Sequence, residues 1–148
     1  TEMYRQQAIE GAIDAINKVS EIADVAILTN LLDHRAEART EQLKAVGINA
    51  PVYTNQGGKG EALKRVLDEF QPSVAVFVDD LGHQHESVAG AAPDIWRLHL
   101  VGEPKLARHI TPSPYAHARI DNWAEALPWV LDKLQGATPA PPIELETI

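Results

Sequence analysis

Residues 74–80 read Val-Ala-Val-Phe-Val-Asp-Asp, five apolar residues followed directly by two carboxylates. A short continuous apolar run of this kind is typical of a strand that is buried on both faces, as in a parallel sheet. The acidic residues mark the carboxyl end of that strand. The segment therefore predicts the fold class, and it indicates the sheet edge at which ligands bind in such folds.

Segments of two kinds alternate on either side of this strand. Short segments rich in apolar residues at 25–28, 51–54 and 96–101 predict three further strands. Between and around the strands, apolar residues recur every three or four positions, which predicts helices. These helices are expected at Met3–Val19, Asp33–Val46, Lys59–Phe70, His83–Ala91 and Trp123–Leu134. Strands joined by crossover helices indicate an α/β fold, here a three-layer Rossmann-like parallel sheet.

The chain of 148 residues is long enough for one domain with a core of its own. We assign residues 1–135 to this domain, and we predict that the Pro-rich, acidic residues 136–148 form a flexible tail. The first helix, within residues 1–20, is interpreted either as the lead into the first strand or as the return from a cap segment upstream.

The amino-acid composition argues against several classes of binding partner and site. Thirteen Lys and Arg against 21 Asp and Glu give a net charge of −8 with His neutral, which argues against nucleic acid as a partner. Cysteine is absent, which excludes disulfides, thiolate metal sites and a Cys nucleophile. No apolar run approaches the roughly 18 residues that span a bilayer, so we expect no membrane partner and a cytoplasmic location.

Three polar features are expected at the carboxyl edge of the sheet. Thr29 and Asn30 follow the first strand, Lys59 follows the second strand and opens a helix, and Asp79 and Asp80 follow the third. Paired carboxylates suit Mg²⁺, whereas Lys and Thr suit phosphoryl oxygens, because phosphoryl transfer depends chiefly on positioning and charge neutralisation. Each feature also has a purely local interpretation as a strand-end hydrogen bond, a turn with a solvated Lys, or a helix cap.

In this order, the residues resemble the haloacid dehalogenase-like (HAD) hydrolase superfamily. The family's second motif, an apolar strand ending in Thr or Ser, is matched by residues 25–30. Its third motif, a Lys at a helix start, is matched by Lys59, and its fourth, a strand ending in acidic residues, by residues 76–80. Lys59 follows Thr29 by 30 residues and Asp79 follows Lys59 by 20, which suits the family's order and spacing.

The resemblance covers roughly the first two-thirds of the chain, and it implies a Mg²⁺-dependent phosphatase-type hydrolase. Such an enzyme acts on a phosphorylated small molecule through an aspartyl-phosphate. By this resemblance, Thr29 and Lys59 are candidate catalytic residues that also bind the phosphoryl group, together with Asn30. Asp79 and Asp80 are the candidate Mg²⁺ ligands.

The family's first motif, an apolar strand ending in Asp-x-Asp, has no counterpart in the sequence. Its first Asp is the nucleophile and its second the general acid and base, so the chemical step lacks its reacting groups here. In the family, this strand lies between those that carry the second and fourth motifs. Without it, Val25–Leu28 and Val74–Val78 would not pair. We therefore expect a further upstream segment that contains the motif.

Two alternatives to a hydrolase remain open. One is a non-catalytic HAD-like binding or assembly module that has no nucleophile. The other is a phosphate-accepting signalling receiver, which uses similar residue types but in a different order along the chain. The presence or absence of an Asp-x-Asp strand separates the hydrolase from the binding module.

Histidines follow the acidic pair closely, in the pattern Asp-Asp-x-x-His-x-His-Glu that ends with His83, His85 and Glu86. This pattern is compatible with a transition-metal site, because imidazole suits Zn²⁺, Mn²⁺ and Fe²⁺. The simpler interpretation is a polar loop and helix start at the rim of the Mg²⁺ site, with His83 available for contact with substrate. His99, in the following strand, is interpreted as structural.

Overall fold

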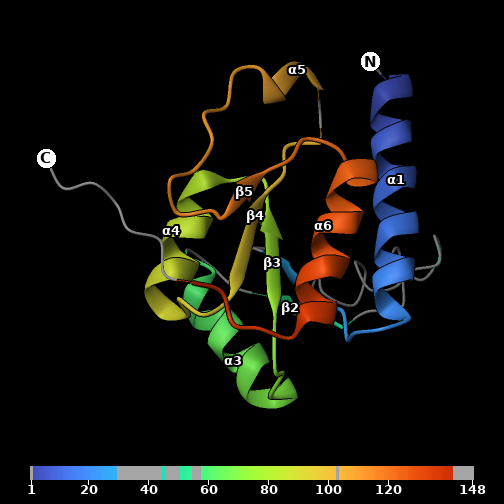
Figure 1. The fold of residues 1–148 in the computed structure, drawn as a ribbon. Helices are drawn as coiled ribbons and strands as arrows, with labels where there is room; N and C mark the ends of the chain where they lie inside the picture. The colour runs from blue at the N-terminus through green and yellow to red at the C-terminus, as the bar shows by residue number, and fades with distance from the viewer. Residues whose placement is uncertain (1, 30–44, 46–50, 55–57, 103, 142–148) are drawn as a thin grey trace, which may run out of the picture.

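Strands and short helices alternate along the chain in the computed structural model, which describes residues 2–29, 45, 51–54, 58–102 and 104–141 (Figure 1). The strands in these ranges are β1 (Ile27–Thr29), β2 (Val52–Thr54), β3 (Val76–Asp79), β4 (Trp96–His99) and β5 (Ala118–Arg119). The helices are α1 (Glu2–Ser20), α3 (Gly60–Phe70), α4 (Gly82–Ala91), α5 (Pro104–Ala107) and α6 (Trp123–Gly136). The predicted α/β class is confirmed.

The sequence patterns located most of these elements to within one or two residues. All four predicted strands are found, and so are four of the five predicted helices. The fifth, Asp33–Val46, lies outside the described residues apart from Ala45. The short elements α5 and β5 were not predicted. No described helix has the length and apolar character that crossing a membrane requires.

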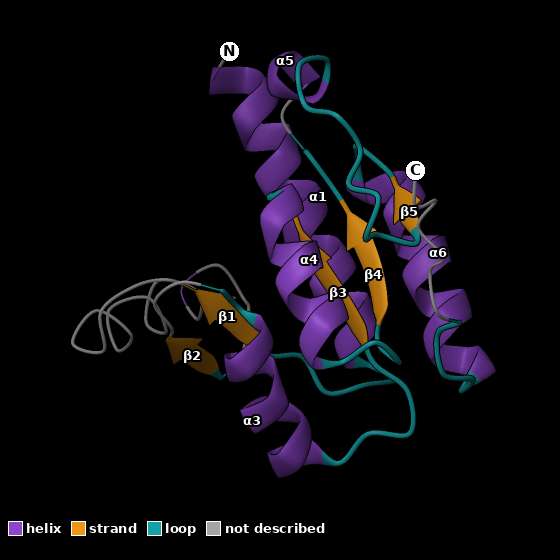
Figure 2. Cartoon of the chain, turned by 90° about the vertical axis from the view of Figure 1, so that its left-hand side faces the viewer, coloured by secondary structure: helices purple, strands orange, loops and turns teal. Residues whose placement is uncertain are grey.

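The described strands form two parallel sheets, so this part of the chain does not form one continuous Rossmann-like sheet. β1 pairs with β2, with Ile27 opposite Val52, and β3 pairs with β4, which in turn pairs with β5. Figure 2 shows β1 and β2 on one side and the three other strands on the other. The expectation that the first and third predicted strands would not pair is confirmed.

One edge of β1 and one edge of β3 have no strand partner among the described residues. The carbonyls of Ala75 and Asp79 accept hydrogen bonds on the β4 side, at 3.0 and 3.1 Å. Backbone groups alternate in direction along a strand, so those of Val76 and Val78 face away from β4. By the same alternation, Leu28 faces away from β2. An edge of this kind presents backbone donors and acceptors that are not used within its own sheet.

Helices cover both faces of the β3–β5 sheet, with α1 and α6 on one face and α3 and α4 on the other (Figure 1). One buried cluster joins β4 to α6, and Val76 and Val78 pack against it. The second cluster contains Phe77, Val88 and Ile95. Because successive side chains of β3 enter different clusters, the strand is packed on both faces, as its apolar sequence indicates.

The segment after α6, predicted as part of a flexible tail, is described as far as Pro141. Trp96 Nε1 donates to the Thr138 carbonyl at 2.9 Å, and the Ala140 amide donates to the Asp94 carbonyl at 2.9 Å. The Ala140 side chain is buried. This part of the segment is therefore bonded to the domain near the start of β4.

The close approach of α3 to α4 is testable at Gly60. A Cβ at this position would lie 2.5 Å from the Ser87 carbonyl oxygen and 2.8 Å from the Ala91 Cβ. We expect Gly60→Ala to lower the free energy of unfolding by about 1–3 kcal/mol, because the helices would have to separate. Urea denaturation measures the change.

Gly90, on α4, provides the matched control, because a Cβ there meets nothing within 4 Å. Gly90→Ala is expected to raise the free energy of unfolding by about 0.5–1 kcal/mol, since Ala favours a helix over Gly. Equal stability of the Gly60→Ala and Gly90→Ala variants would contradict the packing of α3 on α4.

Candidate functional site

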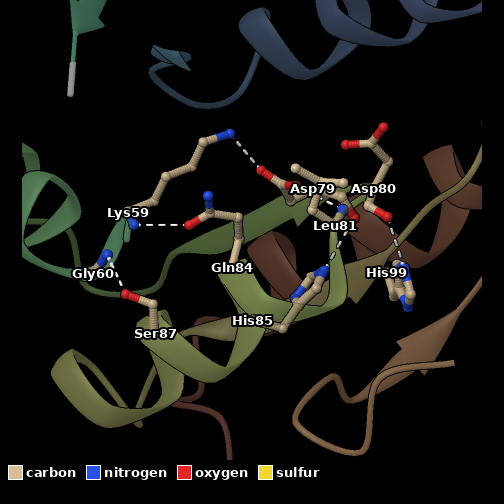
Figure 3. A network of polar contacts seen from close by, with 9 residues as sticks. All are labelled: Lys59, Gly60, Asp79, Asp80, Leu81, Gln84, His85, Ser87 and His99. Atoms are coloured by element: carbon tan, nitrogen blue, oxygen red, sulfur yellow. Dashed lines mark hydrogen bonds and ion pairs between the residues drawn. The ribbon is translucent and has the colours of Figure 1, made fainter. Parts of the chain in front are cut away.

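The carboxyl end of β3 brings together two of the predicted site residues, Lys59 and Asp79 (Figure 3). Nζ of Lys59 lies 2.5 Å from Oδ2 of Asp79, and the two side chains are only 14% and 4% exposed. Lys59 is the residue before α3, and Asp79 is the last residue of β3. The two elements therefore position a largely buried pair of opposite charges at one edge of the sheet.

Both carboxylate oxygens of Asp79 have partners. While Oδ2 faces Lys59, Oδ1 accepts a hydrogen bond of 2.8 Å from the Leu81 amide. A carboxylate that bonds the main chain two residues on fixes a local turn. The turn leaves Asp80 exposed. The Asp80 carboxylate points away from the His99 ring, toward which its carbonyl is directed (Figure 3).

Helix α4 fixes the main chain around Lys59. Oε1 of Gln84 accepts from the Lys59 amide at 2.8 Å, and Oγ of Ser87 accepts from the Gly60 amide at 3.0 Å. The first amides of a helix have no partner within it, and Lys59 makes no side-chain cap of its own. The start of α3 is thus capped by side chains of a neighbouring helix.

Two buried histidines contact the main chain of the acidic pair, Asp79 and Asp80. Nε2 of His85 is 3.0 Å from the Asp79 carbonyl oxygen, and Nε2 of His99 is 2.9 Å from that of Asp80. A carbonyl oxygen only accepts, so each Nε2 carries the proton and donates. Burial lowers the pKa of His85, which favours the neutral ring. From the sequence, His85 was a candidate metal ligand and His99 a structural residue, and neither of these contacts was predicted.

None of the contacts described above involves Thr29, His83 or Glu86. Thr29 ends β1 in register with Thr54, and Asn30 lies outside the described residues. His83 and Glu86 are exposed on α4. Within the described residues, no three or more His, Asp or Glu side chains are grouped to hold a metal. The transition-metal interpretation therefore has no support from the positions of these side chains.

The donor set is compatible with Mg²⁺. Asp80 offers an exposed carboxylate, and Asp79 offers Oδ2, whose partner in the structure is a Lys side chain. Mg²⁺ commonly binds through one or two carboxylates, with waters and substrate phosphate completing the shell. Two neighbouring carboxylates and an ammonium group therefore suit a divalent cation and a phosphoryl group bound side by side.

Comparison with protein-family models, with curated proteins and with solved structures finds no match for this chain. The resemblance to the HAD superfamily thus stays a prediction from the sequence. The candidate site rests on its own geometry.

The buried His85 predicts a pH dependence of stability. Because its pKa in the folded chain lies below the ordinary value of 6.5, the unfolded chain takes up a proton first as the pH falls. The contribution of neutral His85 to the free energy of unfolding is therefore fully present above pH 6.5. It is lost as the pH falls through the lowered pKa. His85→Gln removes this titration and should flatten the pH profile, measured by urea denaturation between about pH 7.5 and 5.5.

His117 gives a useful comparison, because burial lowers its pKa as well. Its ring lies beside Trp96. We expect some pH dependence to persist in His85→Gln and to diminish further when His117→Gln is added. A profile of unchanged slope in His85→Gln would show that His85 does not titrate as the structure indicates.

Proposed function

We propose that this chain forms the phosphate- and Mg²⁺-binding edge of a phosphatase-type hydrolase for phosphorylated small molecules. The observation that carries the proposal is the 2.5 Å contact between Lys59 and Asp79 at the carboxyl end of β3. In a charged pair with little exposure, each side chain neutralises the charge of the other when no ligand is bound. When a phosphoryl group and a cation bind together, the ammonium group turns to the phosphoryl oxygens and the carboxylate to the cation.

The residues at this edge would have distinct roles. Lys59 neutralises the charge that develops on the phosphoryl oxygens, an effect that is strong in a site of low exposure. Asp79 and Asp80 would hold Mg²⁺, which would supply further neutralisation of the phosphoryl charge. Thr29 ends β1 and Asn30 is the next residue in the sequence, and both would donate to phosphoryl oxygens from the other sheet.

The nucleophile would come from an Asp-x-Asp strand inserted between β1 and β3. The outward-facing backbone of Val76, Val78 and Leu28 supports this proposal, because these groups lack a strand partner among the described residues. Filling the gap would join the two parallel sheets into one Rossmann-like sheet of the HAD type. The first Asp of the inserted strand would attack phosphorus and break its bond to the ester oxygen, and the second Asp would give its proton to the departing alcohol. Water, losing a proton to the second Asp, would then attack the aspartyl-phosphate, which releases inorganic phosphate and restores the first Asp.

The second candidate is a non-catalytic module that binds Mg²⁺ and phosphate. It is favoured by one observation, the lack of any Asp-x-Asp triplet in the 148 residues. The two candidates share the binding edge and differ only in the nucleophilic step. The intact mass of the natural polypeptide, measured under denaturing conditions, shows whether further chain is present to supply the strand.

Activity measurements then test the site. We expect the natural polypeptide to hydrolyse p-nitrophenyl phosphate in the presence of Mg²⁺. Lys59→Ala should lower kcat by about 10²- to 10³-fold, as the loss of one charge-stabilising donor does in other enzymes. Asp79→Asn should raise the Mg²⁺ concentration needed for half-maximal rate.

Lys64→Ala is the matched control. Lys64 lies on the same helix with its side chain 50% exposed and only a 4.0 Å contact to Glu61, so its loss should leave kcat unchanged. Normal activity in both Lys59→Ala and Asp79→Asn would refute the site. Binding of Mg²⁺ and phosphate without any turnover would instead favour the non-catalytic module.

A further inference from the structure

We propose that His85 and His99 position the acidic pair, each ring holding the main-chain carbonyl of one Asp and so setting the direction of its carboxylate. The proposal rests on the proposed function in taking Asp79 and Asp80 as the residues that hold Mg²⁺. Neither histidine touches the ligand. Both act through the backbone to which the carboxylates are attached.

The sheet ladder ends at the residues that the histidines hold. The Asp79 carbonyl accepts a ladder hydrogen bond from the Leu100 amide at 3.1 Å and a second one from His85 Nε2 at 3.0 Å. The Asp80 carbonyl lies one residue beyond β3 and accepts from His99 Nε2 at 2.9 Å. Side chains thus extend the hydrogen bonding of the sheet past its last paired strand residue.

The environment of His85 argues against a role in packing alone. Its ring is 0% exposed, and Nδ1 has no hydrogen-bond partner among the described residues. A buried acceptor without a partner destabilises a fold, so stability alone would favour an apolar side chain of similar size. Besides ring contacts with Phe77 and His99, the imidazole adds at this position the donor that faces Asp79.

His99 has both ring nitrogens engaged. Nδ1 accepts from the Ser113 amide at 2.9 Å, while Nε2 donates to the Asp80 carbonyl. These two bonds fix the tautomer, because one nitrogen must accept and the other donate. His99 therefore joins the loop at Ser113 to the acidic turn, and its two bonds can be removed separately by substitution.

Helix α4 holds both partners of the ion pair from adjacent positions. Gln84 accepts from the main chain of Lys59, and His85 donates to the main chain of Asp79 (Figure 3). The distance between the ammonium and the carboxylate therefore depends on one rigid helix. A loss of the His85 donor releases only the Asp79 side, so it should weaken the pair without disturbing Lys59.

The first experiment compares two substitutions at His85 by calorimetric titration of the full chain with Mg²⁺. Leu fills much of the space without a donor, whereas Gln places an amide donor close to the position of Nε2. We expect His85→Leu to raise the Kd for Mg²⁺ by about 10- to 100-fold, the usual effect of losing a residue that orients a metal ligand. His85→Gln should restore the wild-type Kd.

Val88→Ala is the control for a loss of packing. Val88 lies on the same helix, is 0% exposed and belongs to the cluster around Phe77. Its truncation should lower stability while leaving the Kd for Mg²⁺ unchanged. If Val88→Ala weakens Mg²⁺ binding as much as His85→Leu does, or if His85→Gln fails to restore it, the positioning role is overturned.

A second readout needs no metal and separates this proposal from the proposed function. A double-mutant cycle of Lys59→Met and Asp79→Asn, followed by urea denaturation, measures the coupling of the ion pair. We expect this coupling in the wild-type and His85→Gln backgrounds and its loss in His85→Leu. If the wild-type chain binds no Mg²⁺, the proposed function fails while the cycle still decides the role of His85. Equal coupling in all three backgrounds refutes positioning.

If the His85→Leu variant does not fold, Mg²⁺ titration of the His99→Asn variant tests the positioning role instead. The Asn oxygen can still accept from the Ser113 amide, but its short side chain does not reach the Asp80 carbonyl. We expect His99→Asn to raise the Kd for Mg²⁺. His99→Gln retains a donor at the Nε2 position and should bind Mg²⁺ more tightly than His99→Asn. An order reversed between these two variants would overturn the proposal.

Discussion

The negative charge of Asp79, buried at the end of β3, is the constraint on which the arrangement of this edge depends. A buried carboxylate is costly unless it is paired and fully hydrogen-bonded. Lys59 supplies the opposite charge, and the Leu81 amide satisfies the other oxygen. To keep Lys59 in reach, the start of α3 must be held against α4, which Gln84 does through the Lys59 amide. The apolar packing of the two helices and the close approach at Gly60 thus also serve to keep Lys59 beside Asp79.

The division of the strands into two sheets leaves backbone groups of β1 and β3 without a strand partner among the described residues. Parallel strands are stable when both edges are paired or covered, and an open edge presents free backbone donors and acceptors. β1 and β3 each have one such edge in the described residues. Both strands end in a residue of the candidate site, since Thr29 ends β1 and Asp79 ends β3. A strand that joined the sheets would therefore deliver its own carboxyl end beside Lys59.

Much of the fold could be predicted because buried strands leave a local signal. The run Val74–Val78 indicated β3, and the polar residues that follow the strands indicated that Lys59 and Asp79 would lie at the same sheet edge. The ion pair between them was not predicted. The elements α5 and β5 have four and two residues, too few for a period to emerge. The contacts of Gln84 and His99 could not be predicted either, since they cross 25 and 19 residues of sequence and depend on how α4 and β4 pack. Their residue types did mark them as polar groups within predicted elements.

Arg97 and His99, two residues apart on β4, show how such contacts hold the carboxyl end of the sheet in place. Arg97 is 2% exposed, and its guanidinium donates to the carbonyls of Tyr115, Pro93 and Ile95. Two residues on, His99 bonds the main chain at Asp80 and Ser113. Arg97 and His99 therefore hold loops by directed hydrogen bonds, whereas apolar side chains would only fill space. Directed bonds fix orientation as well as position, which is what a site needs when its carboxylates must face a cation at a defined angle.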